Sequence, residues 1–365
     1  MIEFPGLWGL TLNIDRVAFE VFGISVYWYG IIIAAGFLLA VLLAMKASTS
    51  FGLNPDLIID LVLFAAPVAI VAARIYYVVF KWSEFKDNLI DVFNTRKGGL
   101  AIYGAIIAAL IVAWFFAKAR KVKPLHLFDF CIPYLALAQS IGRWGNFINQ
   151  EAFGTNTALP WGMKGDVIGR ELASQMENLS KLGISVDPTL PVHPTFLYES
   201  LWNVLVFVIL IWLRKRKKID GEVFASYMIL YGIGRFFIEG LRTDSLMLGD
   251  FRISQVLAFA FVIAFSGWLF VMRKKAKKLI FERESEGVES SYKAVIERLA
   301  AEDSSSAFDV TLAEKSVTIE DAIEDTIDET IEDTIDEDEA FATEETHATE
   351  GTSSDVEVSE KDMKE

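Results

Sequence analysis

The sequence predicts an all-α polytopic membrane protein with seven transmembrane helices. Apolar residues make up 53% of the chain, and they gather in runs that match bilayer spans of about 20 residues. Basic residues cluster in several of the short segments between these runs, as they do in loops that stay on the cytoplasmic side. The predicted spans are roughly 22–45, 57–80, 99–119, 125–145, 196–213, 223–241 and 252–272.

Charge divides the chain into two unlike parts. Residues 281–365 hold 6 basic and 29 acidic side chains, whereas the rest of the chain holds 28 and 20. We therefore predict a basic membrane domain over residues 1–280 and an acidic tail over residues 281–365. Dense like charge and few aromatic residues favour disorder in the tail.

The basic loops also predict an orientation. Residues 118–123, 214–218 and 273–278 follow the third, fifth and seventh spans and are rich in lysine and arginine, so we place them in the cytoplasm. Seven spans then put the N-terminus outside, the tail inside and the long loop 146–195 outside. The first twenty residues are half apolar, and we expect them to lie along the membrane surface.

The most informative segment is GRWGNFINQEAFG, residues 142–154, at the end of the fourth span. Arg143 lies at the edge of the bilayer between glycines, and Glu151 follows in the same polar run. A cation and a carboxylate beside hydrocarbon are costly, so a functional role is the first hypothesis for them.

Polar residues of six spans are expected at one depth, because helices of an up-and-down bundle alternate in direction. The residues predicted to converge on the outer leaflet are Tyr27, Tyr29, Arg74, Tyr103, Gln139, Arg143, Asn146, Tyr198, Glu199, Asn203, Tyr231, Arg235, Glu239 and Arg242. Together they predict a cationic cavity open to the external half of the membrane. Guanidinium groups suit the phosphate of a lipid head group, and the tyrosines, Asn146, Asn149 and Glu151 offer partners for hydroxyls.

Several of these residues also have a structural interpretation. Arg235 and Glu239 are four residues apart on a helix and could form a buried pair. Arg74 could pair with Asp60 or Glu84, or extend toward the interface. Two further residues fit ordinary roles at a helix end and in a loop, namely Arg242 and His193.

Other classes of site lack their sequence signals. The chain has a single cysteine, Cys131, and three histidines without metal-ligand spacing. It has no phosphate-cradling glycine loop and no basic strip with interleaved aromatics that would suit nucleic acid. With no serine, histidine and carboxylate set in evidence, transfer to a nucleophile from a second substrate fits better than covalent hydrolysis.

The motif resembles the signature of the phosphatidylglycerol–prolipoprotein diacylglyceryl transferase family. The matching residues are Gly142, Arg143, Gly145, Asn146, Phe147, Asn149, Glu151 and Gly154. The resemblance extends over residues 20–275 and includes Tyr29-Gly30, Arg74, Gly98-Gly99 to Gly104, His193-Pro194, Tyr198-Glu199 and Tyr231 through Arg242. It does not cover the tail.

The resemblance implies a multi-pass enzyme of the bacterial cytoplasmic membrane. Such an enzyme moves the diacylglyceryl group of phosphatidylglycerol onto the lipobox cysteine of a preprolipoprotein, forms a thioether and releases glycerol 1-phosphate. The implied partners are phosphatidylglycerol, the lipobox segment and membrane lipid, and the family needs no metal or organic cofactor.

The resemblance also suggests residue roles. Arg143 and Arg235 would stabilise charge on the departing phosphate, and Glu239 would hold Arg235 or Arg242. Some family members carry histidine, a proposed base, where this chain has Tyr103, so the proton acceptor stays open. The residues expected to bind substrate are Tyr29, Arg74, Asn146, Asn149, Glu151, Gly154, His193, Tyr198, Glu199, Tyr231 and Arg242.

Two other functions compete with this one. An anion or lipid transporter would also need arginines in a membrane cavity, but its path must cross both leaflets. The cytoplasmic halves of the predicted spans hold few ionisable residues besides Asp60 and Asp129. A membrane scaffold whose acidic tail recruits partners is the third possibility.

Overall fold

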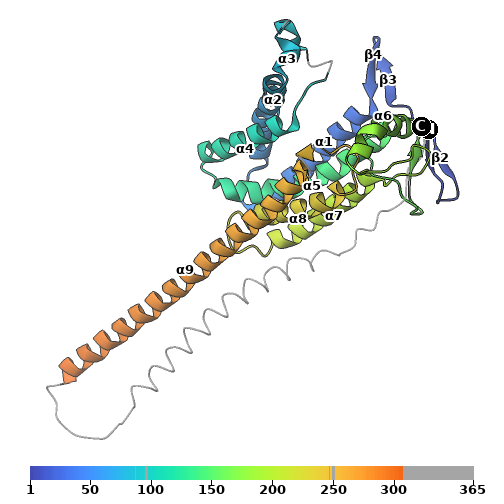
Figure 1. Cartoon of the computed structure of the whole chain (residues 1–365). Coiled ribbons are helices and arrows are strands. Elements are labelled where there is room, and N and C mark those ends of the chain that lie inside the picture. Colours follow the sequence, from blue (N-terminus) through green and yellow to red (C-terminus); the bar gives the residue numbers. More distant parts are fainter. Residues whose placement is uncertain (87, 95–97, 246, 249–250, 307–365) are drawn as a thin grey trace, which may run out of the picture. The chain divides into compact units, whose positions relative to one another are not determined.

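The computed structural model describes residues 1–86, 88–94, 98–245, 247–248 and 251–306 (Figure 1). Its α-helices are α1 (Trp28–Ser48), α2 (Pro55–Phe80), α3 (Trp82–Phe85), α4 (Ile102–Ala119), α5 (Pro124–Asn149), α6 (Asp166–Lys181), α7 (Thr195–Arg214), α8 (Glu222–Glu239) and α9 (Ile253–Ser306). Two short 3-10 helices are η1 (Thr49–Phe51) and η2 (Leu89–Phe93). The strands are β1 (Ile2–Phe4), β2 (Leu10–Leu12), β3 (Val17–Val21), β4 (Ile24–Tyr27), β5 (Lys164–Gly165), β6 (Met247–Leu248) and β7 (Phe251–Arg252).

Each predicted span contains a long helix, and local sequence explains several of the helix ends. The Asn54 side chain accepts a hydrogen bond from the Asp56 N–H at 2.9 Å, with proline as the first helical residue of α2. At its other end α5 stops at Gln150, which adopts a left-handed conformation with φ of 53°.

Six of these helices are long and apolar enough to cross a membrane. They are α1, α2, α4, α5, α7 and the first part of α9. The remaining predicted span, α8, is not among these six and carries three charged residues, Glu222, Arg235 and Glu239, in its 18 residues. The chain is therefore a mostly helical, multi-pass membrane protein, while a count of seven spans stays a prediction.

Helix α5 lies at the centre of the bundle and packs against α1, α4, α7 and α8, while α2 pairs with α4. Close approach of α1 to α5 depends on Gly36, where a Cβ atom would lie 2.9 Å from Ile141. The order of contacts shows antiparallel packing, because the start of α1 meets the end of α5 at Tyr29 and Gly145. At one end of the bundle, the start of α7 and the end of α8 therefore lie next to the end of α5.

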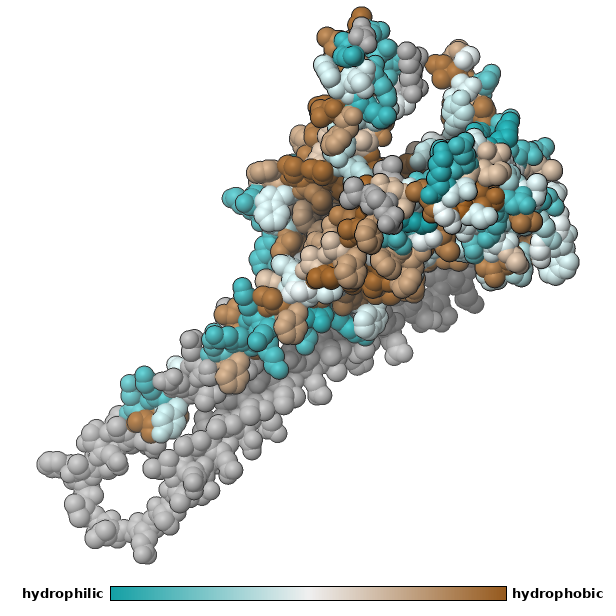
Figure 2. Space-filling view, viewed as in Figure 1, coloured by the Kyte–Doolittle hydropathy of each residue, from teal (hydrophilic) through white to brown (hydrophobic). Residues whose placement is uncertain are grey.

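Large apolar side chains cover the outside of the helices. Leu38 on α1, Leu63 on α2 and Phe115 on α4 are more than half exposed. The space-filling view shows brown, hydrophobic surface over the helices and teal, polar surface over the strand-rich end (Figure 2). This distribution suits contact with hydrocarbon rather than water, as expected for a membrane protein.

A small sheet and helix α6 form a compact layer at the end of the bundle that holds the start of α1. The sheet has the order β2-β1-β5, with Ile2 opposite Leu12 on one side and Gly165 on the other. Ile2, Met163 and Leu172 are buried in its core. Ile2 and Phe4 of β1 pack against loop 146–195, whereas Trp8 and Leu10 are exposed, so the expectation that the first residues lie along the membrane surface stays a prediction.

The last helix continues past the predicted start of the tail, whose boundary stays a prediction. We expected the tail to begin at residue 281, but α9 continues to Ser306 because no glycine or proline cluster interrupts the sequence there. Residues 307–365 lie outside the described residues, and the prediction of disorder falls mostly on them.

Candidate functional site

A single buried carboxylate, Glu199, contacts three arginines at the sheet end of the bundle, namely Arg143, Arg235 and Arg242. Arg143 Nη2 lies 2.5 Å from Glu199 Oε2, while Arg242 Nη1 and Arg235 Nη1 lie 3.0 and 3.5 Å from Oε1. Glu199 comes from the first turn of α7, Arg143 from the end of α5, and the other two from the end of α8 and just beyond it. The structure thus brings together three helices at one charged centre.

A second layer of carboxylates pairs with the same arginines. Arg235 Nη2 lies 2.7 Å from Glu239 Oε2, an ion pair whose approach is not aligned for a hydrogen bond. Arg242 forms a bidentate contact with Asp244, at 2.9 Å from Nε and 2.7 Å from Nη2. Arg242 therefore does not extend to the bilayer surface, since its side chain is 10% exposed and held in ion pairs.

The charges of this cluster are paired. The guanidinium groups of Arg143, Arg235 and Arg242 contact Glu199, Glu239 and Asp244, so each buried charge among them has a partner, and Arg252 donates a further hydrogen bond to the Glu239 backbone oxygen. Burial alone would lower the pKa of Arg242, but its hydrogen bond to Asp244 and the charges of Asp244, Glu199 and Glu239 raise it above its usual value. Arg143 is the most accessible of the three, with 27% of its side chain exposed.

The glycine-rich motif forms a polar strip beside Arg143. Arg143 Nη1 donates to Asn146 Oδ1 at 3.4 Å, and Asn146 Nδ2 donates to Glu151 Oε1 at 2.8 Å. Asn149 reaches the same carboxylate oxygen at 3.4 Å. Gly145 is required here, because a Cβ atom would lie 2.7 Å from the ring of Tyr29.

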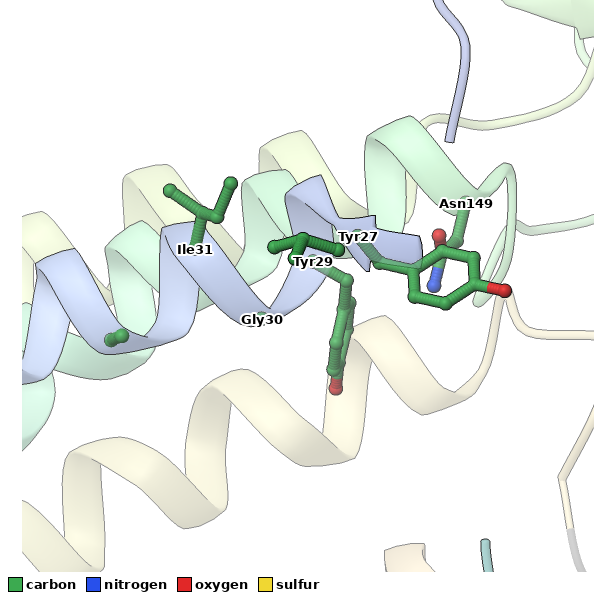
Figure 3. A pocket seen from close by; sticks show the side chains of 7 residues that line it. Tyr27, Tyr29, Gly30, Ile31 and Asn149 are labelled. Atoms are coloured by element: carbon green, nitrogen blue, oxygen red, sulfur yellow. The ribbon is translucent and has the colours of Figure 1, made fainter. Parts of the chain in front are cut away.

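A cavity of about 500 Å³ opens next to this strip. Its lining includes Tyr27, Tyr29, Ile31 and Asn149, and most of it comes from the first turns of α1. The ring of Tyr29 points away from α1 toward a neighbouring helix, while Asn149 lies at the end of α5 (Figure 3). Tyr29 is also within electrostatic range of Glu151 and Arg143, which connects the cavity to the charged centre.

Further tyrosines surround Arg143. Tyr231 lies within electrostatic range of Arg143, Arg235, Glu199 and Tyr103. The ring of Tyr231 also stacks on Tyr227, whose hydroxyl donates to Gln139 Oε1 at 2.9 Å. Tyr103, in the first turn of α4, is 46% exposed and free to meet a substrate.

Gly154 joins three segments behind the centre. Its N–H donates to His193 O at 2.9 Å, and a Cβ atom would lie 2.8 Å from the His193 side chain and 2.9 Å from Leu241 O. His193 Nδ1 lies 3.1 Å from the Tyr198 hydroxyl, which also accepts a 2.8 Å hydrogen bond from the Trp161 indole. Burial lowers the pKa of His193, so its imidazole is neutral at pH 7.

Arg74 lies in a different environment from the other predicted site residues. All five of its N–H donors point to backbone carbonyls, which belong to Asp91, Val92, Asn94, Gly98 and Gly99. Its guanidinium also lies 5.0 Å from the Phe85 ring centre. Neither expected salt bridge forms, because Asp60 pairs with Arg120 and Glu84 with Lys81. The structure gives Arg74 the role of holding the chain between α2 and α4, and its role in binding substrate stays a prediction.

Three residues of the site were missed by the sequence analysis, namely Asp244, Trp161 and Arg252, whose guanidinium donates to the Glu239 backbone oxygen. Asp244 follows Arg242 by two residues, and this spacing in a loop was the available signal for a local ion pair. Trp161 gave no signal, because its contact with Tyr198 depends on how loop 146–195 folds back. Among the residues that the structure describes, no group of His, Cys, Asp or Glu side chains is arranged to hold a metal ion.

Comparison with known proteins decides the family. A family model described as prolipoprotein diacylglyceryl transferase matches residues 16–272. The chain belongs to the prolipoprotein diacylglyceryl transferase family. Every residue of the charged centre lies inside the matched range, whereas the acidic tail lies outside it.

Curated relatives agree with this assignment over most of their length. The chain is 46% identical over 251 residues to a protein from Finegoldia magna and 45% identical over 249 residues to one from Clostridioides difficile, which covers 68% of this chain and 92% of each relative. A relative from Listeria innocua is 44% identical over 262 residues, covering 72% of this chain and 91% of that protein. All three are named phosphatidylglycerol–prolipoprotein diacylglyceryl transferase.

Proposed function

We propose that this protein transfers the diacylglyceryl group of phosphatidylglycerol to the lipobox cysteine of a preprolipoprotein. The sulfur attacks the glyceryl carbon that carries the phosphate, a C–S bond forms, and the C–O bond to phosphate breaks. The products are a thioether-linked lipoprotein precursor and glycerol 1-phosphate. The observation that carries this proposal is the charged centre at Glu199, which adjoins a membrane-level cavity.

Arg143 is the residue we assign to the lipid phosphate. It has the largest exposed fraction of the three arginines, and its planar guanidinium can contact two phosphate oxygens at once. The cavity beside Tyr29 has an apolar lining that suits the glyceryl and acyl portions of the lipid. Asn146, Asn149 and Glu151 then provide partners for the hydroxyls of the head group.

Arg235 is the residue we assign to stabilising charge on the leaving phosphate. Negative charge grows on the departing oxygen during C–O cleavage, and a fixed cation in a site screened from water stabilises it strongly. Glu239 holds Arg235 in place, while Glu199 and Asp244 hold Arg242. The positions of Arg143, Arg235 and Glu199 are therefore supported by neighbouring residues that we do not assign to the phosphate, namely Arg242, Tyr198, His193 and Gly154.

Activation of the thiol needs a proton acceptor. A cysteine thiol has a pKa of about 8.5 in water, so most of it is protonated at neutral pH. We assign this task to the phenolate form of Tyr103, which has first released its hydroxyl proton to water and then takes the thiol proton; Tyr103 is exposed and lies within electrostatic range of Tyr231 in the same centre. The positive field of Arg143 and Arg235 favours the thiolate that results.

The membrane placement that fits this reaction has seven spans in the bacterial cytoplasmic membrane. In it the N-terminus and the charged centre face outward, and the basic loops and the tail lie in the cytoplasm. Lysine and arginine dominate the loops at the opposite end of the bundle from Glu199, which supports this orientation. An exported preprolipoprotein would then meet the enzyme from the outer leaflet.

A transporter function finds less support. The two acidic residues noted in the other half of the bundle are already paired: Asp60 with Arg120, and buried Asp129 with Lys217 and the N–H groups of Gly221 and Phe224. These contacts fix helix ends and leave both carboxylates paired.

The direct test is incubation of the purified protein with phosphatidylglycerol vesicles and a synthetic lipobox peptide, followed by mass spectrometry of the peptide. We expect a mass increase of one diacylglyceryl group. A peptide with serine in place of the lipobox cysteine is the matched control and should stay unmodified. A cysteine peptide that also stays unmodified would contradict the proposed function.

A further inference from the structure

Two segments beside the charged centre expose large apolar side chains. The first is the hairpin of β3 and β4, where Phe22 at the tip is 100% exposed and Phe19 and Ile24 are more than half exposed. The second is the connection from α2 to α4, where Ile90 is 79% and Phe93 is 85% exposed. Exposed apolar side chains gathered in this way indicate a contact surface.

The tip of the hairpin is built at a conformational cost. Phe22 has φ of 50°, and Gly23 follows with φ of 74°. A bulky residue other than glycine, asparagine or aspartate rarely occupies this left-handed region. The Phe22 side chain is fully exposed and packs against nothing within its own hairpin, so no packing contact offsets the free-energy cost of its left-handed backbone. An aromatic residue in this position is explained by a contact outside the chain.

Both segments are tethered at the ends of membrane-spanning helices. The Trp28 N–H, at the start of α1, donates to Arg16 O at 3.1 Å and closes the base of the hairpin. The second segment is fixed at both ends, because it leaves α2 at Phe80 and enters α4 at Ile102. A five-residue strand extends by about 16 Å at most, whereas the polar zone of each leaflet is about 5–8 Å deep, so the hairpin tip stays in contact with lipid when the hairpin leans along the membrane surface.

We propose that Phe19, Phe22, Ile24, Ile90 and Phe93 form a membrane-contact collar that lies in the interfacial region of the leaflet next to the charged centre. The partner is the lipid surface itself. The collar residues extend the apolar, lipid-facing surface of α1, α2 and α4 beyond the helix ends, and this continuity favours lipid as the partner. The collar fixes the depth of the site relative to the lipid phosphates, which goes beyond the reaction proposed above.

A depth measurement with fluorescent labels tests the collar. The chain has one cysteine, so Cys131→Ala gives a cysteine-free background. We would introduce Phe22→Cys or Phe93→Cys, with Ser174→Cys on the exposed face of α6 as the aqueous control and Leu38→Cys on α1 as the hydrocarbon control. Each variant is labelled with an environment-sensitive fluorophore and reconstituted into phosphatidylglycerol–phosphatidylethanolamine vesicles.

We expect labels at positions 22 and 93 to emit at shorter wavelength than the label at 174. Lipids with a nitroxide near the head group should quench them more than lipids with a nitroxide deep in the chain, and the label at 38 should show the opposite preference. Labels at 22 and 93 that behave like the label at 174 would overturn the proposal. So would a shift that appears only with added lipobox peptide, or only at high protein density, since these indicate a peptide or a second copy.

An activity measurement separates the collar from the reaction. The double variant Phe22→Asp/Phe93→Asp should raise the apparent KM for vesicle phosphatidylglycerol by about tenfold, the value of one buried aromatic side chain. Turnover in detergent micelles should be unchanged, and Ser174→Asp should match the unmodified protein in both. Equal vesicle activity of the double variant contradicts the collar, and so does an equal loss of its activity in vesicles and micelles. An unmodified protein that is inactive in both contradicts the proposed function instead.

Discussion

The three guanidinium groups around Glu199 differ in how many of their N–H donors are not already hydrogen-bonded within the protein. Arg242 uses Nε, Nη1 and Nη2 on Asp244 and Glu199, so it is the least able to bind a new anion. Arg143 contacts Glu199 closely but Asn146 only at 3.4 Å, and its side chain is the most exposed. At the level of single residues, Arg143 is therefore the best placed to receive a phosphate.

Replacing Arg143 or Arg235 with alanine should lower transfer by about 10²–10³-fold, the cost of removing one preorganised charged donor. The measurement is the rate of peptide modification in vesicles, with membrane insertion checked by gel filtration of the purified variant. Arg143→Lys keeps the charge without the planar fork, and we expect it to recover only part of the rate. Normal transfer by either alanine variant would contradict the assigned roles.

Tyr103 can be tested through the pH dependence of the rate. Tyr103→Phe removes the hydroxyl and should lower kcat by about 10²-fold, as expected for loss of a general base. Tyr103→His should stay active with its acid limb shifted to lower pH, because imidazole has an unperturbed pKa of about 6.5 against about 10 for a phenol and so accepts protons earlier. The readout is kcat/KM from neutral to alkaline pH. Full activity of Tyr103→Phe would exclude the hydroxyl from proton transfer.

Among the secondary-structure elements, the connection between α2 and α4 is held in place by one side chain, that of Arg74. Arg74 holds the carbonyls on both sides of the turn into α4, and the Ala101 N–H donates to Ala73 O at 3.1 Å. Gly104 lets α4 approach α2, since a Cβ atom would lie 2.6 Å from Ala72 O. These contacts set the position from which Tyr103 enters the first turn of α4.

Gly98 and Gly99 form a matched pair for testing this connection. Both have positive φ, at 85° and 83°, but a Cβ atom at Gly98 meets nothing within 4 Å, whereas one at Gly99 would lie 2.4 Å from Arg74 Nη1. Gly98→Ala should therefore cost about 1–2 kcal/mol of backbone strain. Gly99→Ala should cost about 1.5–3 kcal/mol more for each charged hydrogen bond that Arg74 loses.

The comparison is made by thermal unfolding of the two purified variants in detergent, together with limited proteolysis of the segment between α2 and α4. We expect Gly99→Ala to have the lower Tm and the faster cleavage. Equal Tm values for the two variants would mean that Arg74 does not hold this segment in place.

The helices could be predicted from the sequence, but the strands could not. Long apolar runs mark α1, α2, α4 and α7 clearly, because a bilayer demands length and hydrophobicity from any span. Strands of two to five residues are too short to show a repeating pattern. In addition, β1 and β5 pair across more than 150 residues of sequence. Only the fold of loop 146–195 brings them together.

For the whole molecule, the family match separates the membrane domain from the acidic tail. The match ends at residue 272, and chain contacts divide after Ser285. Removing residues 285–365 should therefore leave peptide modification unchanged. The measurement compares initial rates of the full chain and the truncated chain in the same vesicles, at matched amounts of inserted protein. A truncated chain that inserts stably but does not modify the peptide would assign the tail a part in the reaction.

The sequence was enough to predict most of the residues that belong to the charged centre, but not which of its charged side chains contact each other. Alternating helix directions were enough to group Arg143, Glu199, Arg235 and Glu239 at one depth. Depth alone does not say which side chains face each other, and Arg74 shares the depth of the others but is enclosed by its own loop. The central position of Glu199 depends on the rotation of α7 about its axis, which hydropathy does not determine.

Glu199 already occupies the place that an anionic ligand would take on Arg143. The resting protein thus contains its own competitor, a carboxylate that imitates one face of a phosphodiester. In the reaction proposed above, lipid binding would therefore be an exchange, and the affinity would be the difference between two contacts with the same guanidinium. Such an exchange would let the glycerol phosphate product leave, because Glu199 would return to Arg143 as the phosphate departs.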